Sequence, residues 1–179
     1  MIDIKESRGD RRYAAAHMKR ITITSLLASF ALFLGACGND ASNQNVAPPP
    51  SDDGVRTIAI TANDSMQFSI TSIEAAPGEE IRIQLSNIGR MPKQSMAHNW
   101  VLLQPMDNAA INAFGMKASS HAPEYIPAGA NEVIAHTKML GAGESDSLTF
   151  KVPSAPGSYP FICSFPGHYA IMKGTLTVK

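Results

Sequence analysis

The sequence has no net charge, and it contains few cysteines. Among its 179 residues, 15 Lys and Arg balance 15 Asp and Glu, so nothing in the composition argues for nucleic acid as a partner. Hydrophobic residues make up 44 %, too few for a protein that crosses a membrane many times. Only two cysteines occur, Cys37 and Cys163, and no internal repeat is evident. The length therefore fits one globular domain preceded by a leader.

The longest apolar run of the N-terminal region, residues 21–33, is short for a membrane-spanning helix but as long as the core of a signal peptide. Lys19 and Arg20 precede it, and Leu-Gly-Ala-Cys follows it directly, ending at Cys37. This pattern resembles a bacterial lipoprotein signal. We interpret residues 1–36 as a leader with such a signal peptide and predict that Cys37 is the acylated first residue of the mature protein. An uncleaved anchor helix is the alternative.

Residues 37–54 are polar and contain three consecutive prolines, which predicts a flexible tether. A lipid on Cys37 followed by this tether would hold a domain beside a bacterial membrane in the periplasm, with the outer membrane favoured. We also expect translation to start at Met18, because residues 1–17 add nothing that a signal needs. Two cysteines in an exported protein would otherwise suggest a disulfide. A lipid on Cys37 leaves the sulfur of Cys163 for other chemistry.

From Val55 onward, short runs of apolar residues alternate with polar or small ones, which indicates half-buried strands. Turn signals such as Pro77-Gly78 separate them, and several short strands at this spacing predict a β-sandwich or Greek-key barrel. Residues 105–130 break the alternation, and we expect one short helix around 109–116. We therefore predict one all-β domain over residues 55–179. The alternating runs are 58–60, 81–85, 148–152 and 175–178.

Side chains that bind metals cluster near the C-terminus. Cys163, His168 and Met172 stand within ten positions, and a second imidazole, His98, precedes an apolar run that we interpret as a buried strand. One thiolate, two imidazoles and a weak thioether suit copper in both oxidation states, whereas structural zinc usually takes four strong ligands. Because Met172 would cap the metal, no coordination position stays open. The set therefore favours electron transfer over bond-making.

Each of these residues also has a plainer interpretation. Alone, His98 would be a core or loop histidine, Cys163 an inert buried thiol and Met172 core packing; their joint occurrence favours a metal site. A copper-storage protein, a copper enzyme and a structural zinc domain are the alternative functions. The enzyme would need a second, open metal site, and no further histidine cluster exists for one. We interpret His121 and His136 as surface residues.

Three separated segments resemble the azurin family of cupredoxins. They are residues 96–102, 134–138 and 163–176, and the last spaces its Cys, His and Met as the ligand loop of that family does. The resemblance covers residues 56–179. It implies a Greek-key cupredoxin β-sandwich of about eight strands with one short helical insertion. It also implies one type 1 copper per chain and an electron carrier, not an enzyme.

The resemblance assigns the copper ligands to particular residues. His98, Cys163 and His168 would bind the copper, and Met172 would be a weak axial ligand. The backbone carbonyl of Ala97 would be a more distant fifth donor. The family usually has glycine at the position of Ala97, so the approach of this carbonyl is expected to differ.

The same resemblance gives roles to residues around the ligands. Asn99 would tie the two ligand loops together, and backbone N–H groups of Asn99 and Phe165 would donate to the Cys163 thiolate. Two departures from the family also stand out. Gly78 falls where relatives have a disulfide cysteine, and Asn87 falls where many relatives have a titrating histidine. We therefore predict that the reduction potential is only weakly coupled to pH.

An exposed apolar patch around the edge of His168 is the last feature that the resemblance implies. Such a patch marks a docking surface, and soft methionine side chains suit weak, short-lived complexes with several partners. The expected partners are redox proteins such as cytochromes, reductases or oxidases. Ordinary core packing is the alternative for each member. The expected members are Met66, Met91, Met96, Met116, Phe165 and Ile171.

Overall fold

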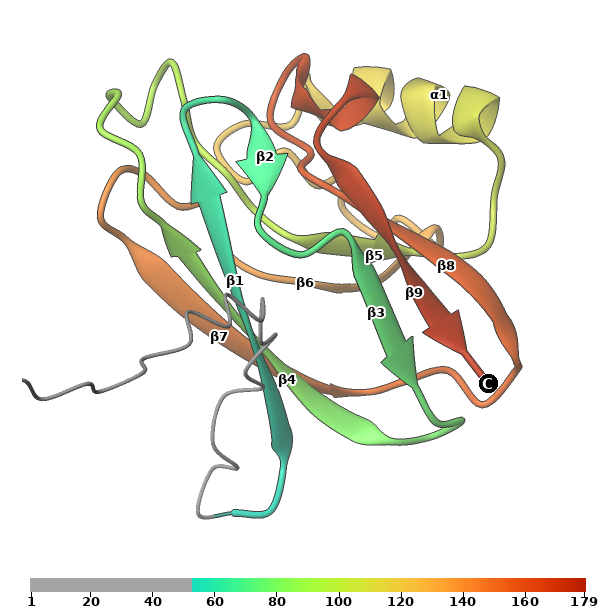
Figure 1. The fold of residues 1–179 in the computed structure, drawn as a ribbon. Coiled ribbons are helices and arrows are strands. Elements are labelled where there is room, and N and C mark those ends of the chain that lie inside the picture. Colours follow the sequence, from blue (N-terminus) through green and yellow to red (C-terminus); the bar gives the residue numbers. More distant parts are fainter. Residues whose placement is uncertain (1–52) are drawn as a thin grey trace, which may run out of the picture. The chain divides into compact units, whose positions relative to one another are not determined.

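A computed structural model describes residues 53–179, which form two β-sheets, one α-helix and a short 3-10 turn (Figure 1). One sheet has the strand order β2-β1-β4-β7 and the other β3-β9-β8-β5-β6. This arrangement confirms the predicted all-β sandwich with one helical insertion. The elements are β1 (Arg56–Asn63), β2 (Gln67–Phe68), β3 (Ser72–Ala75), β4 (Glu80–Asn87), β5 (Val101–Leu103), α1 (Asn108–Ala118), β6 (Val133–His136), β7 (Ser145–Lys151), β8 (Gly157–Ile162), η1 (His168–Ala170) and β9 (Lys173–Val178).

The predicted leader, residues 1–36, and nearly all of the tether, residues 37–54, lie outside the described residues. Cleavage before Cys37 and its acylation therefore stay predictions. Within residues 53–179, no helix is long and apolar enough to cross a membrane.

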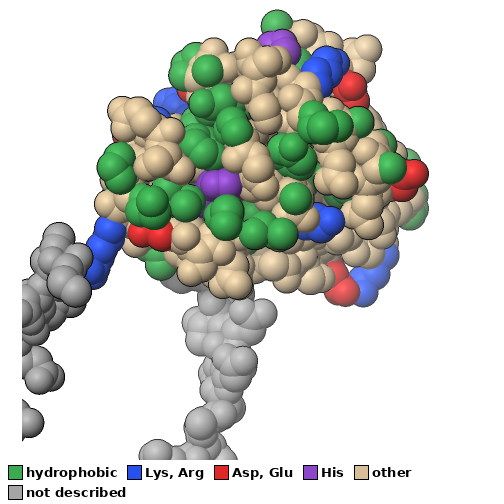
Figure 2. Space-filling view, turned by 90° about the horizontal axis from the view of Figure 1, so that it is seen from above, with side chains coloured by type: hydrophobic (Ala, Val, Ile, Leu, Met, Phe, Trp, Pro, Cys, Tyr) green, Lys and Arg blue, Asp and Glu red, His purple; other side chains and the backbone are tan. Residues whose placement is uncertain are grey.

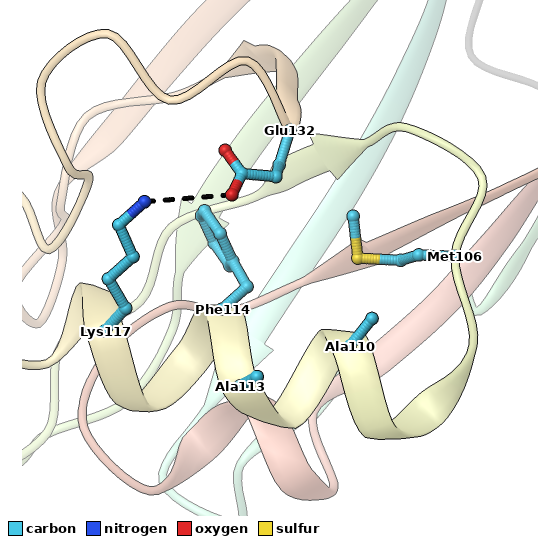
Figure 3. Close-up of a pocket in the computed structure, with 6 residues that line it drawn as sticks. All are labelled: Met106, Ala110, Ala113, Phe114, Lys117 and Glu132. Carbon is cyan, nitrogen blue, oxygen red and sulfur yellow. Dashed lines mark ion pairs between the residues drawn. The ribbon is translucent and has the colours of Figure 1, made fainter.

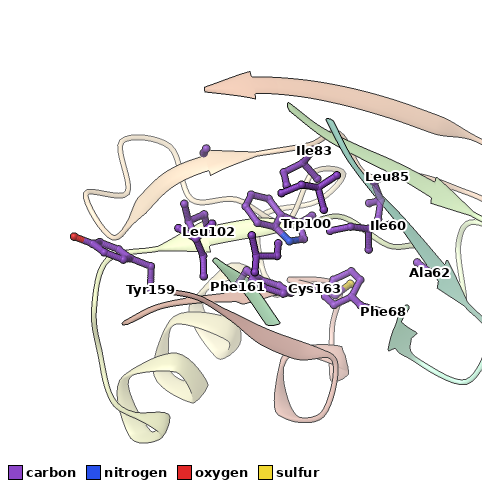
Figure 4. Close-up of a cluster of buried hydrophobic side chains, with 14 of the residues drawn as sticks. Ile60, Ala62, Phe68, Ile83, Leu85, Trp100, Leu102, Tyr159, Phe161 and Cys163 are labelled. Carbon is purple, nitrogen blue, oxygen red and sulfur yellow. The ribbon is translucent and has the colours of Figure 1, made fainter. Parts of the chain in front are cut away.

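The main core lies between the two sheets. In β4, Ile81, Ile83 and Leu85 are buried while the residues between them are not, as the alternating pattern predicts. Figure 4 shows Ile83 and Leu85 on the same side of the cluster as Ile60 of β1, facing Trp100 and Phe161. The rings of Trp100 and Phe161 lie 5.3 Å apart between centroids. Each such buried side chain stabilises the fold by about 1.5–3 kcal/mol.

Strand β8 does not alternate cleanly, because both faces of its sheet are covered, one by the main core and the other by α1. Its Pro160 is opposite Thr175 of β9, but the backbone N–H of Thr175 donates to Thr71 on the far side. Pro160 and Thr175 are therefore a pair that exchanges no backbone hydrogen bonds, so the missing N–H of the proline costs nothing on this side. Pairing with β5 involves only Phe161 and Ile162, so the missing N–H of Pro160 removes no bond from either ladder.

Helix α1 covers the other face of the five-stranded sheet. Asp107 caps its start by accepting a hydrogen bond from the N–H of Ala110 at 2.8 Å. Ile111 and Phe114 of the helix pack with residues of β5 and β8 into a second, smaller core. The helix includes the predicted residues 109–116 and lies beside η1 (Figure 1).

Candidate metal centre

The candidate metal centre lies where β5 begins and β8 ends. These two strands are paired through Val101 and Ile162, so the segment before β5 and the segment after β8 leave the sheet at the same edge. His98 is in the first segment and Cys163 in the second. Two hydrogen bonds with Leu140, at 2.9 and 2.8 Å, fix the backbone of His98. Pairing of the strands thus brings together residues that are far apart in the sequence.

The loop after β8 is closed at its base by a hydrogen bond of 2.9 Å from the N–H of Cys163 to the carbonyl of Met172. Gly167, at φ 81°, supplies the left-handed residue that starts η1. The carbonyl of His168 accepts hydrogen bonds from the N–H groups of Ile171, at 3.0 Å, and Met172, at 2.8 Å. The loop therefore holds Cys163, His168 and Met172 in one compact unit.

Three ligating side chains meet at this point. The Sγ of Cys163 lies 3.8 Å from Nδ1 of His98 and 3.6 Å from Nδ1 of His168. The three ligating atoms lie within 4.8 Å of one another, and all three residues are buried. One sulfur and two imidazole nitrogens away from water are the donor set that a type 1 copper takes. The side chains present thus fit copper.

The other two predicted ligand residues are next to this group along the chain or through the backbone. The carbonyl oxygen of Ala97 lies 3.8 Å from Sγ of Cys163. Met172 is buried and is joined to Cys163 through the backbone bond at the base of the loop. With Met66 and Ile171, among others, Met172 borders a hollow of about 370 Å³.

Burial raises the pKa of the Cys163 thiol to about 12. Two backbone N–H groups, of Asn99 and Phe165, hydrogen-bond to the sulfur and act against this rise, because they stabilise a thiolate. They are the two donors that the sequence predicts for it. In the metal-free protein at neutral pH the thiol is protonated, so a cation that binds here must displace one proton from sulfur.

The two imidazoles are already in the form that binds a metal. Burial lowers the pKa of His168 to about 4, and the neighbouring His98 adds to this effect. Burial also lowers the pKa of His98, while the backbone carbonyl of Asn63 and the carboxylate of Asp64 act in the opposite direction. Both rings are therefore neutral at pH 7, and neither has to lose a proton when a cation binds.

Asn99 joins the two ligand segments. Its Nδ2 donates to Oγ of Ser164 at 2.8 Å, and its Oδ1 accepts from the N–H of Ser164 at 2.8 Å. Nδ2 also reaches the carbonyl of Glu124 at 3.4 Å. The sequence predicts the role of Asn99 but not its partner, because a serine between a cysteine and a phenylalanine has no pattern that marks it as buried. The sequence likewise has no pattern that indicates the backbone pairing of Leu140 with His98.

The predicted apolar patch is exposed in part. Met116, Ile171 and Met91 are 64 %, 62 % and 41 % exposed, while Met66 and Met96 are half-buried. Figure 2 looks onto the end where α1 and η1 lie, and hydrophobic side chains gather there around a histidine.

The structure corrects the placement of Phe165 in this patch. Phe165 is only 7 % exposed, because its ring packs against Tyr125 at 5.3 Å and His168 at 4.7 Å between centroids. It therefore lies beneath the surface beside His168 and is not part of an exposed patch.

A second hollow, of about 260 Å³, lies over α1 (Figure 3). An ion pair between Lys117 and Glu132, at 3.7 Å, closes one side, and Phe114 and Met106 line another. No cysteine or histidine lines it, so it does not belong to the metal centre.

Comparisons with known proteins agree with this geometry. A profile of the family described as copper binding proteins, plastocyanin/azurin family, matches residues 56–179. Azurin from Achromobacter denitrificans is 44 % identical over 123 residues, which are 67 % of this chain and 82 % of the azurin.

Two solved structures have a similar fold. The azurin Az-iso2 from Methylomonas sp. strain J superposes with a TM-score of 0.60 at 32 % identity, over 69 % of this chain and 97 % of that one. Auracyanin A from Chloroflexus aurantiacus, described as a "blue" copper protein, gives a TM-score of 0.63 at 29 % identity, over 69 % and 98 % of the two chains.

Proposed function

The chain belongs to the plastocyanin/azurin family of copper-binding proteins, and from this premise we propose that it carries electrons between redox proteins while a lipid on Cys37 anchors it to a bacterial membrane. It is an electron-transfer protein with one type 1 copper, and it is not an enzyme. The observation that carries this function is the buried group of His98, Cys163 and His168. The membrane anchor and the docking surface are the proposed parts.

Copper bound at this centre supplies a one-electron couple between Cu(II) and Cu(I). The protein contributes a fixed set of donors. His98 is held by its pairing with Leu140, and Cys163 by the base of the ligand loop, so neither position depends on the metal. Donors that stay in place need little rearrangement when the charge at the centre changes.

We propose that Met172 would be a weak ligand of the copper and that the carbonyl of Ala97 would be a more distant donor. Met172 is buried and tied by its backbone to Cys163, which supports its assignment. For Ala97, the support is the 3.8 Å distance from its carbonyl oxygen to the Cys163 sulfur. With both in place, the centre would leave no position for water, as electron transfer without bond-making requires.

The reduction potential is expected to stay nearly constant between about pH 6 and 8, the range in which a histidine switch would act. Asn87 is buried where many relatives have a histidine, and it does not titrate; its amide donates to Leu140 at 3.1 Å and accepts from Gly89 at 2.9 Å. His121 and His136 are exposed, so water screens their charge. Voltammetry across this range checks the prediction.

The matched variant for this measurement is Asn87→His. A protonated imidazole near the centre favours the reduced, less positive copper, so the potential should rise as the pH falls through the pKa of the new histidine. A steep pH dependence in the unchanged protein would contradict the prediction.

We propose that partners dock on the face formed by Met91, Met116 and Ile171, and that electrons pass through the edge of His168. These side chains are exposed and apolar, and apolar patches on soluble proteins mark interaction sites. His168 is the first residue of η1, the turn beside α1 that is capped by Ile171. Methionines adapt to several partners, which suits short-lived complexes.

Replacing Ile171 by glutamate should slow electron self-exchange by about tenfold, because two copies meeting through this face would bring like charges together. Higher ionic strength should restore part of the rate. The control is Ser147→Glu, which adds the same charge on the exposed edge strand β7 and should leave the rate unchanged. Equal rates in the Ile171→Glu protein and the unchanged protein would exclude this face as the docking site.

Membrane anchoring is supported by the Leu-Gly-Ala-Cys sequence that ends at Cys37 and by the polar residues that follow it. Export places the domain in the periplasm, and the outer membrane is the favoured location. The tether would keep the domain close to membrane redox proteins without embedding it.

Cys37→Ala should move the protein from the membrane fraction to the soluble fraction, because the variant has no sulfur to acylate. It should still bind copper and stay blue. Cys163→Ser gives the matched opposite result, since it should remain in the membrane fraction without colour. An unmodified peptide that spans Ala36 and Cys37 in mass spectra of the mature protein would rule out acylation.

A further inference from the structure

Tyr169 follows the ligand His168 directly and is the second residue of η1. It is half-buried and packs against the second core, under α1. The other non-ligand residues between Phe165 and Met172 are exposed; they are Pro166, Gly167, Ala170 and Ile171. Tyr169 is therefore the non-ligand side chain of this stretch that anchors it to the body of the domain.

The ring of Tyr169 rests on Gly115 of α1. A methyl group added to the Cα of Gly115 would overlap the ring carbons Cγ, Cδ1 and Cδ2. The backbone of Gly115 is helical and does not require glycine for its conformation. Glycine within a helix is less favourable than alanine by about 1 kcal/mol. The structural reason for this residue is the close approach of the tyrosine ring.

The turn that Tyr169 anchors contains the ligand His168 and is hydrogen-bonded to the backbone of Met172. The His168 carbonyl accepts from the N–H groups of Ile171 and Met172, so the backbone of His168 cannot move without that of Met172. At the far end of the loop, Nζ of Lys173 donates to Oδ1 of Asn108, in the first turn of α1, at 2.9 Å. The ligand loop is thus attached to the helix on this side at two points.

We propose that Tyr169 is a positioning residue for the copper ligand His168. Its ring, seated on Gly115, holds η1 against α1 and keeps the imidazole of His168 in place with or without the metal. This inference rests on the copper-binding function stated above. It assigns a role to the contact between α1 and the ligand loop, because a ligand that is already placed loses less entropy when copper binds.

Hydrogen exchange in the metal-free protein and Cu(II) affinity test this role together. In Tyr169→Ala, the amides of Ile171 and Met172 should exchange about tenfold faster, and Cu(II) affinity should fall by about tenfold, the usual scale for residues that orient metal ligands. Tyr169→Phe should match the unchanged protein, since ring carbons make the contact. The amide of Ile83, in the core strand β4, serves as the control for global unfolding.

Gly115→Ala gives a second test that keeps the tyrosine. The new methyl group should displace the ring and cause the same losses, whereas in the Tyr169→Ala background it should cause no further loss. This pattern is non-additive, as expected for residues in direct contact. If Tyr169→Ala does not fold, Gly115→Ala in the otherwise unchanged protein still tests the contact, and unchanged exchange and affinity there would overturn the proposal.

Two other results would also overturn the proposal. One is wild-type exchange and affinity in Tyr169→Ala; the other is an equal loss from Gly115→Ala in both backgrounds. Failure of the unchanged protein to bind copper would contradict the function itself, while exchange in the metal-free protein would still decide the role of Tyr169.

Discussion

The copper-loaded protein should be intensely blue, and Cys163→Ser should abolish this colour completely. The colour of such a centre comes from charge transfer between a thiolate and Cu(II), and Cys163 is the cysteine among the described residues. A serine hydroxyl is a harder donor and does not ionise in a buried site. The visible spectrum of the purified, copper-loaded variant measures the effect.

His136→Ala is the control for this experiment. His136 is exposed and lies at the end of β6, with its Nδ1 hydrogen-bonded to the backbone carbonyl of Thr137 at 3.0 Å, so its removal should leave the blue colour unchanged. A pale unchanged protein, or a blue Cys163→Ser protein, would contradict the assignment of Cys163 as the copper ligand.

Asn99→Ala should lower the free energy of unfolding of the metal-free protein by about 3 kcal/mol. The change removes both 2.8 Å hydrogen bonds between Asn99 and Ser164. It also leaves the buried N–H of Ser164 without the acceptor that it has in the structure, and an unsatisfied buried donor costs more than a lost hydrogen bond. Denaturation by urea, followed by tryptophan fluorescence of the buried Trp100, gives the value.

Ser164→Ala separates the two bonds. It removes the hydroxyl group but keeps the bond from the Ser164 N–H to Asn99, so it should cost only about 1 kcal/mol. Equal losses in the two variants would show that the backbone bond contributes little to holding the ligand segments together.

The strands that alternate cleanly could be predicted from the sequence, and so could β5, whose unbroken apolar run indicates a buried strand, but β8 could not. In β4, each apolar residue lies between polar ones because one face of the strand meets the core. In β8, neighbours and covering layers surround the strand on every side, so Tyr159, Phe161 and Ile162 are all buried and no period of two survives. Pro160 also argues against a strand at this position, because proline is uncommon in the interior of a sheet.

Part of the candidate metal centre could also be predicted from the sequence, and part could not. Cys163, His168 and Met172 belong to one loop, so their spacing alone predicts that they meet. Other contacts at the centre join distant segments: Leu140 pairs with His98, and Gly115 of α1 contacts the ring of Tyr169, the neighbour of His168. Such contacts depend on how the sheets and the helix pack. A glycine in a helix and a tyrosine beside a ligand have no shared pattern that predicts their contact.

The hydrogen bond that closes the ligand loop at its base bears on whether folding or copper binding comes first. Since Cys163 and Met172 are joined through the backbone, and His98 is fixed by Leu140, the polypeptide can complete its folding before it meets an ion. Copper then enters a finished pocket instead of directing its assembly. Folding and metal supply can therefore be separate steps, with the metal second.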